Sequence, residues 1–152
     1  MDRLARKFET ARSYVPTPIE DINRKAEIGI IAFGTTHHAI RECRDQLRVE
    51  HSIQTSYLRI CAYPFNDMLE KFISLYKRVY VVEQNRDGQM RQLINQDVGG
   101  ECIRTRSVLH YTGIPIDARF ITDDIVAQES GKTNTHQEVK SVESGSSMVG
   151  GE

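Results

Sequence analysis

The middle of the chain alternates between short apolar runs and longer amphipathic stretches. Residues 28–33 (IGIIAF) form an almost unbroken apolar run, which is typical of a strand covered on both faces in a parallel sheet. Gly34 ends this run, and Ile40, Cys43 and Leu47 then recur at helical spacing among charged residues. The pattern predicts a strand, a turn and a helix.

The same order occurs twice more. Residues 53–60 are rich in β-branched and aromatic side chains and predict a second strand, after which Asn66 or Asp67 can cap a helix. Residues 79–82 predict another doubly buried strand, followed by a third amphipathic helix. Three successive units of this kind predict an α/β fold with a parallel sheet and right-handed crossovers.

The segments on either side are less regular. Within residues 1–25, apolar side chains lie on one face of a short predicted helix, and two prolines then impose an extended path. Residues 106–111 predict one more strand and residues 123–128 a short final helix. Residues 130–152 hold too few apolar side chains to offset the entropy of ordering, so we expect disorder there. We therefore divide the chain into a helix and linker, one domain over residues 26–129, and a tail.

Composition narrows the classes of function. The 152 residues suffice for one domain, and 20 Lys and Arg against 21 Asp and Glu give a net charge of −1, so no overall field attracts nucleic acid or a membrane surface. No apolar stretch approaches the roughly 20 residues that span a bilayer, and the first residues lack the apolar core of a signal peptide. Cys43, Cys61 and Cys102 are too widely spaced for a zinc or iron–sulfur motif, and we expect reduced thiols, two of them buried. The chain is expected to be cytoplasmic, with neither nucleic acid nor membrane as a partner.

One glycine pattern invites a phosphate-binding interpretation. Residues 29–36 (GIIAFGTT) have the glycine spacing of a P-loop, but its lysine is missing and the intervening residues belong to the predicted strand. The hydroxyl of Thr35 or Thr36 can instead cap the following helix or accept an anion, and capping is the simpler role. His37 and His38 come next. Because neighbours on a helix point in different directions, we expect an exposed histidine that contacts another domain rather than a shared metal.

The most unusual segment is residues 83–89 (EQNRDGQ), which follows a predicted buried strand at its carboxyl end. An ordinary turn explains part of it, with Asp87 as the cap of the next helix and a glycine that relieves the backbone. That interpretation leaves Glu83, Asn85 and Arg86 unexplained. These three residues are therefore candidates for recognition of another surface.

Four segments of the chain together resemble those of a known enzyme family. They are residues 6–12 (RKFETAR), 28–36 (IGIIAFGTT), 58–65 (LRICAYPF) and 78–90 (RVYVVEQNRDGQM). Taken in this order, they resemble the α subunit of 2-oxoacid:ferredoxin oxidoreductases, especially of the 2-oxoglutarate type. The resemblance covers roughly residues 3–128 and is most specific over residues 83–89.

The resemblance implies a fold, a reaction and a setting. The fold would be three-layered, α/β/α, with a mostly parallel sheet, like the C-terminal domain of transketolase and domain II of pyruvate:ferredoxin oxidoreductase. The enzymes of the family use thiamine diphosphate to decarboxylate a 2-oxoacid oxidatively, pass the acyl group to coenzyme A and send electrons through iron–sulfur clusters to ferredoxin. A larger α-subunit domain normally precedes this one.

The chain departs from the family in the parts that hold cofactors. In the family a Gly-Asp-Gly motif and a downstream Asn of the β subunit bind thiamine diphosphate and magnesium, and this sequence has neither, nor cluster-ligating cysteines. We therefore expect no cofactor on this chain alone, with thiamine diphosphate, magnesium and an iron–sulfur cluster in a partner β subunit. No catalytic or metal-binding residue is predicted. The expected function is that of a fragment or split subunit that contributes to assembly and is inactive alone.

The contact with partner chains is expected at the edge where the parallel strands end. The candidate interface residues are Gly34, Thr35, Thr36, His37, Glu83, Asn85, Arg86 and Gln89. Arg86 is the preferred anchor, because a planar guanidinium can pair with a carboxylate through two hydrogen bonds. The expected partners are the β subunit and the remaining α-subunit domain, with ferredoxin and coenzyme A reached only through the complex.

Two other functions compete with this one. A free-standing interaction or small-ligand-binding module of the same fold would need no partner subunit. An independent hydrolase or transferase would need a nucleophile constellation such as Gly-x-Ser-x-Gly, which the sequence lacks.

Overall fold

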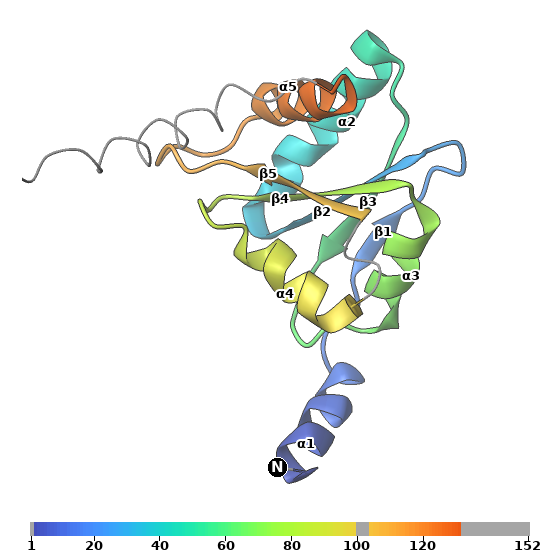
Figure 1. The fold of residues 1–152 in the computed structure, drawn as a ribbon, viewed down its shortest axis with the longest axis vertical. Coiled ribbons are helices and arrows are strands. Elements are labelled where there is room, and N and C mark those ends of the chain that lie inside the picture. Colours follow the sequence, from blue (N-terminus) through green and yellow to red (C-terminus); the bar gives the residue numbers. More distant parts are fainter. Residues whose placement is uncertain (1, 100–103, 132–152) are drawn as a thin grey trace, which may run out of the picture.

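A five-stranded sheet with helices on both faces forms the body of the protein (Figure 1). The computed structural model describes residues 2–99 and 104–131. The strands are β1 (Ile19–Asp21), β2 (Ile28–Phe33), β3 (Thr55–Ile60), β4 (Arg78–Glu83) and β5 (Thr105–Leu109). They are arranged in the order β1-β3-β2-β4-β5, in which β1 is antiparallel to β3 and all other neighbours are parallel.

The helices form two outer layers. Helices α2 (His37–His51) and α5 (Ala118–Glu129) lie side by side on one face of the sheet, and α3 (Asp67–Leu75) and α4 (Gln89–Val98) cover the other (Figure 1). Helix α1 (Asp2–Arg12) projects away from the sheet, and a 3₁₀ turn, η1 (Gly34–Thr36), precedes α2. The predicted three-layer arrangement with a mostly parallel sheet is confirmed. None of the described helices is both long and apolar enough to cross a membrane.

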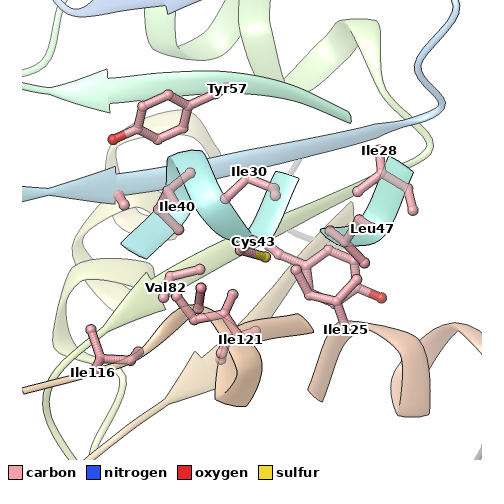
Figure 2. Close-up of a cluster of buried hydrophobic side chains, with 14 residues drawn as sticks. Ile28, Ile30, Ile40, Cys43, Leu47, Tyr57, Val82, Ile116, Ile121 and Ile125 are labelled. Carbon is pink, nitrogen blue, oxygen red and sulfur yellow. The ribbon is translucent and has the colours of Figure 1, made fainter. Parts of the chain in front are cut away.

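The central strand β2 explains the unbroken apolar run in the sequence. Ile28 and Ile30 point into the core under α2 and α5, where they meet Ile40, Cys43 and Ile125 (Figure 2). Ile31 and Phe33 point to the opposite side, into the second core under α3 and α4. Both faces of β2 are therefore buried, and an apolar side chain is favoured at every position.

The glycine of this strand is required by a close approach rather than by a turn. A Cβ atom at Gly29 would lie 2.8 Å from Cε1 of Phe72 and 2.9 Å from Cδ2 of Tyr76. The two rings of α3 and its C-cap thus pack directly on the backbone of β2. The P-loop interpretation of this glycine is wrong, since Gly29 is buried inside the sheet.

The structure differs from the sequence expectations at three places. Part of the predicted linker forms the edge strand β1, whose three side chains are all exposed and therefore leave no burial pattern to detect. The last helix begins at Ala118 rather than at residue 123, because Asp117 Oδ1 accepts a hydrogen bond from the backbone N–H of Phe120 at 2.7 Å. The strand predicted at residues 106–111 is β5 and ends at Leu109.

The predictions for the cysteine thiols, the C-terminal tail and the cap of α3 have different outcomes. Cys43 is buried, which raises the pKa of its thiol to about 11, whereas Cys61 is exposed. Cys102 and most of the tail predicted to be disordered, residues 132–152, lie outside the described residues. Of the two caps predicted for α3, Asn66 and Asp67, the structure shows Asn66, with its Oδ1 accepting from the N–H of Met68 at 3.2 Å.

Candidate functional site at the carboxyl edge of the sheet

The two loops that contain the candidate interface residues, after β2 and after β4, lie next to each other. Strands β2 and β4 are parallel neighbours, so the loop that follows each of them emerges at the same edge of the sheet. The side chain of Gln84 bridges the loops by donating to Oγ1 of Thr36 at 3.2 Å. The chain reverses its winding direction here, since β2 leads to a helix on one face and β4 to a helix on the other. Open α/β sheets form a crevice at such a switch point.

The loop after β2 is held by its backbone and by this bridge. Thr36 occupies the N-cap position of α2, but its own backbone is already helical (φ −55°, ψ −23°) and its side chain makes no capping hydrogen bond. Its hydroxyl accepts from Gln84 instead, and the residue is buried. The predicted capping role is therefore wrong for Thr36, and Thr36 is not available to a partner. Gly34 and Thr35 are exposed.

Asn85 organises the loop after β4. Its Oδ1 accepts hydrogen bonds from the backbone N–H groups of Asp87 at 3.1 Å, Gly88 at 2.8 Å and Gln89 at 3.3 Å. Gly88 takes a left-handed conformation (φ 66°), which a glycine adopts without strain, and it serves as the N-cap of α4. The amide of Asn85 is thus occupied by its own loop.

Glu83 completes the cap of α4 from inside the protein. It is fully buried, and its carboxylate accepts from the backbone N–H of Met90 at 2.8 Å and of Arg91 at 3.2 Å, and from Nδ2 of Asn85 at 2.6 Å. These bonds satisfy N–H groups that the first turn of a helix cannot pair internally. The prediction that Asp87 caps α4 is therefore wrong. Glu83 is buried, so its side chain cannot contact a partner.

Five of the eight candidate residues remain at the surface. Arg86 is well exposed, and its guanidinium pairs with the adjacent Asp87 carboxylate at 2.8 Å, which raises the pKa of Arg86. Gln89 is exposed at the start of α4, and His37 is half-buried at the start of α2. With Gly34 and Thr35 they form a continuous edge, whereas Thr36, Glu83 and Asn85 shape the loops from below.

His37 lies against the sheet rather than free in solvent. Its ring stacks on Tyr57, with centroids 5.7 Å apart, and its Nδ1 is 3.4 Å from the Tyr57 hydroxyl. Partial burial lowers the pKa of His37, and the positive charges of Arg59, His38 and Arg41 lower it further. Burial raises the pKa of Tyr57 to about 12. The lowered pKa of His37 favours its neutral form, and the raised pKa of Tyr57 keeps its hydroxyl protonated at neutral pH.

The structure adds residues to this edge that the sequence did not single out. A cavity of about 510 Å³ lies between the loops after β2, β4 and β5, and is lined by Thr35, Gln84, His110, Tyr111, Gly113, Ile114 and Pro115. Tyr111 and Ile114 are 47% and 64% exposed, and Tyr63 at the end of β3 is 48% exposed. The sequence signal that could have identified Tyr111 and Ile114 is the presence of large apolar side chains in a turn that contains Gly and Pro. We call Gly34, Thr35, His37, Tyr63, Arg86, Gln89, Tyr111 and Ile114 the carboxyl-edge surface.

Within residues 2–99 and 104–131, no group of three or more His, Cys, Asp and Glu side chains could hold a metal ion. The sequence also lacks the Gly-Asp-Gly motif that holds the diphosphate in the family it resembles. We therefore assign no chemical step to a described residue.

Comparison with known proteins locates the fold. No protein-family model matches the chain, and no curated protein matches it. Among solved structures, the 2-oxoglutarate:ferredoxin oxidoreductase from Magnetococcus marinus, with 2-oxoglutarate, coenzyme A and succinyl-CoA bound, matches with a TM-score of 0.67 and 20% identity, over 77% of this chain and 20% of that chain. A split gene transketolase, an inactive beta4 tetramer, matches with a TM-score of 0.59 and 14% identity, over 76% of this chain and 43% of that chain.

The chain has a fold that both enzymes contain as one domain. This confirms the three-layer, transketolase C-terminal-domain-like fold expected from the sequence. The alpha chain of a probable 2-oxoacid ferredoxin oxidoreductase from Thermoplasma acidophilum also matches, at 20% identity over 72% of this chain and 93% of that chain, with a TM-score of 0.45 that is too low to bear on the fold. The chain spans about a fifth of the M. marinus chain and less than half of the transketolase chain.

Proposed function

We propose that the chain is the C-terminal domain of the α subunit of a thiamine-dependent 2-oxoacid:ferredoxin oxidoreductase. The proposal rests chiefly on the TM-score of 0.67 with the M. marinus enzyme. The order of four sequence segments that resemble this α subunit supports it further. The bound 2-oxoglutarate, coenzyme A and succinyl-CoA of that enzyme make 2-oxoglutarate the substrate we propose.

Within such a complex, the domain contributes to assembly rather than to the chemistry. The carboxyl-edge surface combines exposed Tyr63, Tyr111 and Ile114 with the guanidinium of Arg86. Aromatic side chains and arginine are the residue types enriched in protein interfaces. The buried caps formed by Glu83 and by the Asn85 amide hold the loop that carries Arg86 in one conformation, which lowers the entropic cost of docking.

The proposed partners carry the cofactors. Thiamine diphosphate, magnesium and the iron–sulfur cluster would be held by a β subunit, and the remaining α-subunit domain would lie beside this one. Coenzyme A and ferredoxin would reach this chain only through the complex. Its cytoplasmic location stays a prediction from the sequence.

Purification from the native cell tests this proposal. The tagged protein should bring down the remaining α-subunit domain and a chain with Gly-Asp-Gly and cluster-ligating cysteines. The complex, but not the chain alone, should reduce ferredoxin with 2-oxoglutarate and coenzyme A.

A matched pair of variants locates the contact. Truncating Ile114 to Ala should weaken the association, whereas truncating Leu75, an equally exposed apolar residue at the end of α3, should not. Turnover of 2-oxoglutarate by the isolated chain would contradict the proposal. A chain that stays monomeric in the native extract would favour the free-standing module instead.

A further inference from the structure

The arginines of helix α2 lie on one side of it. Arg41, Arg44 and Arg48 recur at intervals of three or four residues, so they share one side of the helix. This side faces β3, because Arg44 donates to the carbonyl oxygen of Thr55 at 3.1 Å. It ends at the carboxyl edge of the sheet, where the first turn of α2 contains no acidic residue.

Two acidic side chains of α2, those of Glu42 and Glu50, lie on its other side, toward α5. Glu50 forms an ion pair with Arg119 of α5 at 2.7 Å, and the charge of Glu42 also acts on Arg119. Gln46, between them, accepts from the hydroxyl of Thr122 at 2.8 Å. The carboxylates of Glu42 and Glu50 are thus turned away from the arginine side of α2.

The two arginines farther along α2 are balanced locally. Arg44 pairs with Asp21 of the edge strand β1 at 2.5 Å, and Arg48 pairs with Asp45 at 3.1 Å. These pairs, together with Arg41, line a cleft of about 240 Å³ between α2 and β1. The carboxylates of Asp21 and Asp45 pair with Arg44 and Arg48, and among the described residues neither forms an ion pair with Arg41.

At the carboxyl edge of the sheet, the charged side chains around His37 are all basic. The charged groups that act on His37 are Arg59, His38 and Arg41, and all three are cationic when charged. Arg59 reaches over the loop after β2, with a guanidinium nitrogen 3.4 Å from the carbonyl oxygen of Gly34. His38 and Arg41 are exposed, and Arg59 is half-buried. We call His38, Arg41 and Arg59, which surround the His37 ring, the cationic patch.

We infer that the cationic patch docks carboxylate side chains of the partner subunit that meets the carboxyl-edge surface. This inference rests on the proposed function, and it adds the chemistry of the partner's surface. Two guanidinium groups whose fork geometry matches carboxylates supply the permanent charge, and exposed Tyr63 lies at the same edge for apolar contact. A nucleic acid would require an extended basic surface, whereas the chain has a net charge of −1 and the patch has two permanent cations.

A defined acidic peptide tests the patch without knowledge of the partner. The ¹⁵N-labelled full chain is titrated with capped hexaglutamate at pH 7 and low salt, and backbone amide shifts are followed. Shifts should centre on the cationic patch and disappear on addition of salt. Arg41→Glu should reduce the affinity roughly fivefold, the ratio that corresponds to about 1 kcal/mol for one exposed charge pair. Arg24→Glu, the same change at an exposed arginine before β2, should leave it unaltered.

Three results would overturn the inference. In the first, hexaglutamate fails to bind, and in the second its shifts centre on two arginines outside the patch, Arg86 and Arg106. The third is that a single-stranded oligonucleotide binds at the patch in place of the peptide. Circular dichroism of Arg41→Glu separates a lost contact from a lost fold, and Arg59→Gln is a second, neutral variant for the same measurement.

The native complex separates this inference from the proposed function. Partner chains retained on the tagged protein should be released at lower salt from Arg41→Glu than from wild type or Arg24→Glu. If all three retain the partners equally at every salt concentration, the inference fails and the proposed function stands. If wild type retains no partner at all, the proposed function fails, and the hexaglutamate titration still decides the chemistry of the patch.

Discussion

Replacing Glu83 by Ala tests whether a buried carboxylate, rather than the exposed one next to the turn, holds the loop after β4. The substitution removes the acceptor for the N–H groups of Met90 and Arg91 and for Nδ2 of Asn85. A lost helix cap costs about 1 kcal/mol, and a buried donor left unpaired costs about 1–3 kcal/mol. With three donors affected and partial access of water to the half-buried helix start, we expect a loss of about 3 kcal/mol.

Urea unfolding of the full chain, followed by circular dichroism at 222 nm, measures this loss. The midpoint should fall while the slope with denaturant is unchanged, because the surface exposed on unfolding stays the same. A thermal scan should show a fall of roughly 10 °C, since 1 kcal/mol shifts the midpoint of a domain of this size by about 3–4 °C. Glu83→Gln, which keeps one acceptor oxygen, should lie between the two proteins.

Asp87→Ala is the matched control. Asp87 was the cap predicted from the sequence, but its side chain is exposed and pairs with Arg86. Its replacement should change stability by less than about 1 kcal/mol, as is usual for a surface ion pair. If Asp87→Ala destabilises the protein as much as Glu83→Ala, the assignment of the cap to Glu83 is wrong.

Three further substitutions test other parts of the structure. Gly29→Ala places a Cβ within 2.9 Å of the rings of Phe72 and Tyr76, so urea unfolding should show a loss of about 1–3 kcal/mol; an unchanged midpoint would contradict the close packing. The pKa of His37 is lowered in the folded state, so the unfolded chain takes up this proton first and stability is lost as pH falls below about 6.5. His37→Gln should reduce the loss of unfolding free energy between pH 7 and pH 5. A loss identical to that of wild type would show that His37 is not its cause. Arg86→Ala should weaken binding to the partner subunits about tenfold in a titration, the effect of one interface anchor, and unchanged affinity would remove Arg86 from the interface.

The sequence alone determined the strand and helix order of the core. A strand such as β2, buried on both faces, must be apolar at nearly every position, and an amphipathic helix such as α2 must repeat its apolar residues every three or four positions. Both patterns are local, so they can be found along the chain without knowledge of the fold. The same holds for Asn66, whose cap on α3 involves a residue only two positions away.

The tertiary structure decided which side chains are available to a partner. Glu83 and Thr36 are polar residues in loops, and their sequence neighbours gave no reason to expect burial. Each is buried because a second segment covers or engages it, the first turn of α4 for Glu83 and Gln84 for Thr36. Likewise, the edge strand β1 exists only through its pairing with β3, about 40 positions later in the chain.

The carboxyl-edge surface shows the same division. The sequence placed polar residues after two strands, and the parallel pairing of β2 and β4 then brought their loops together. Tyr63 and Ile114 joined this edge only because β3 and β5 end there as well, a consequence of strand order that no local pattern encodes. Local periodicity thus determined the elements, whereas contacts between distant segments decided burial, and with it the surface left for binding.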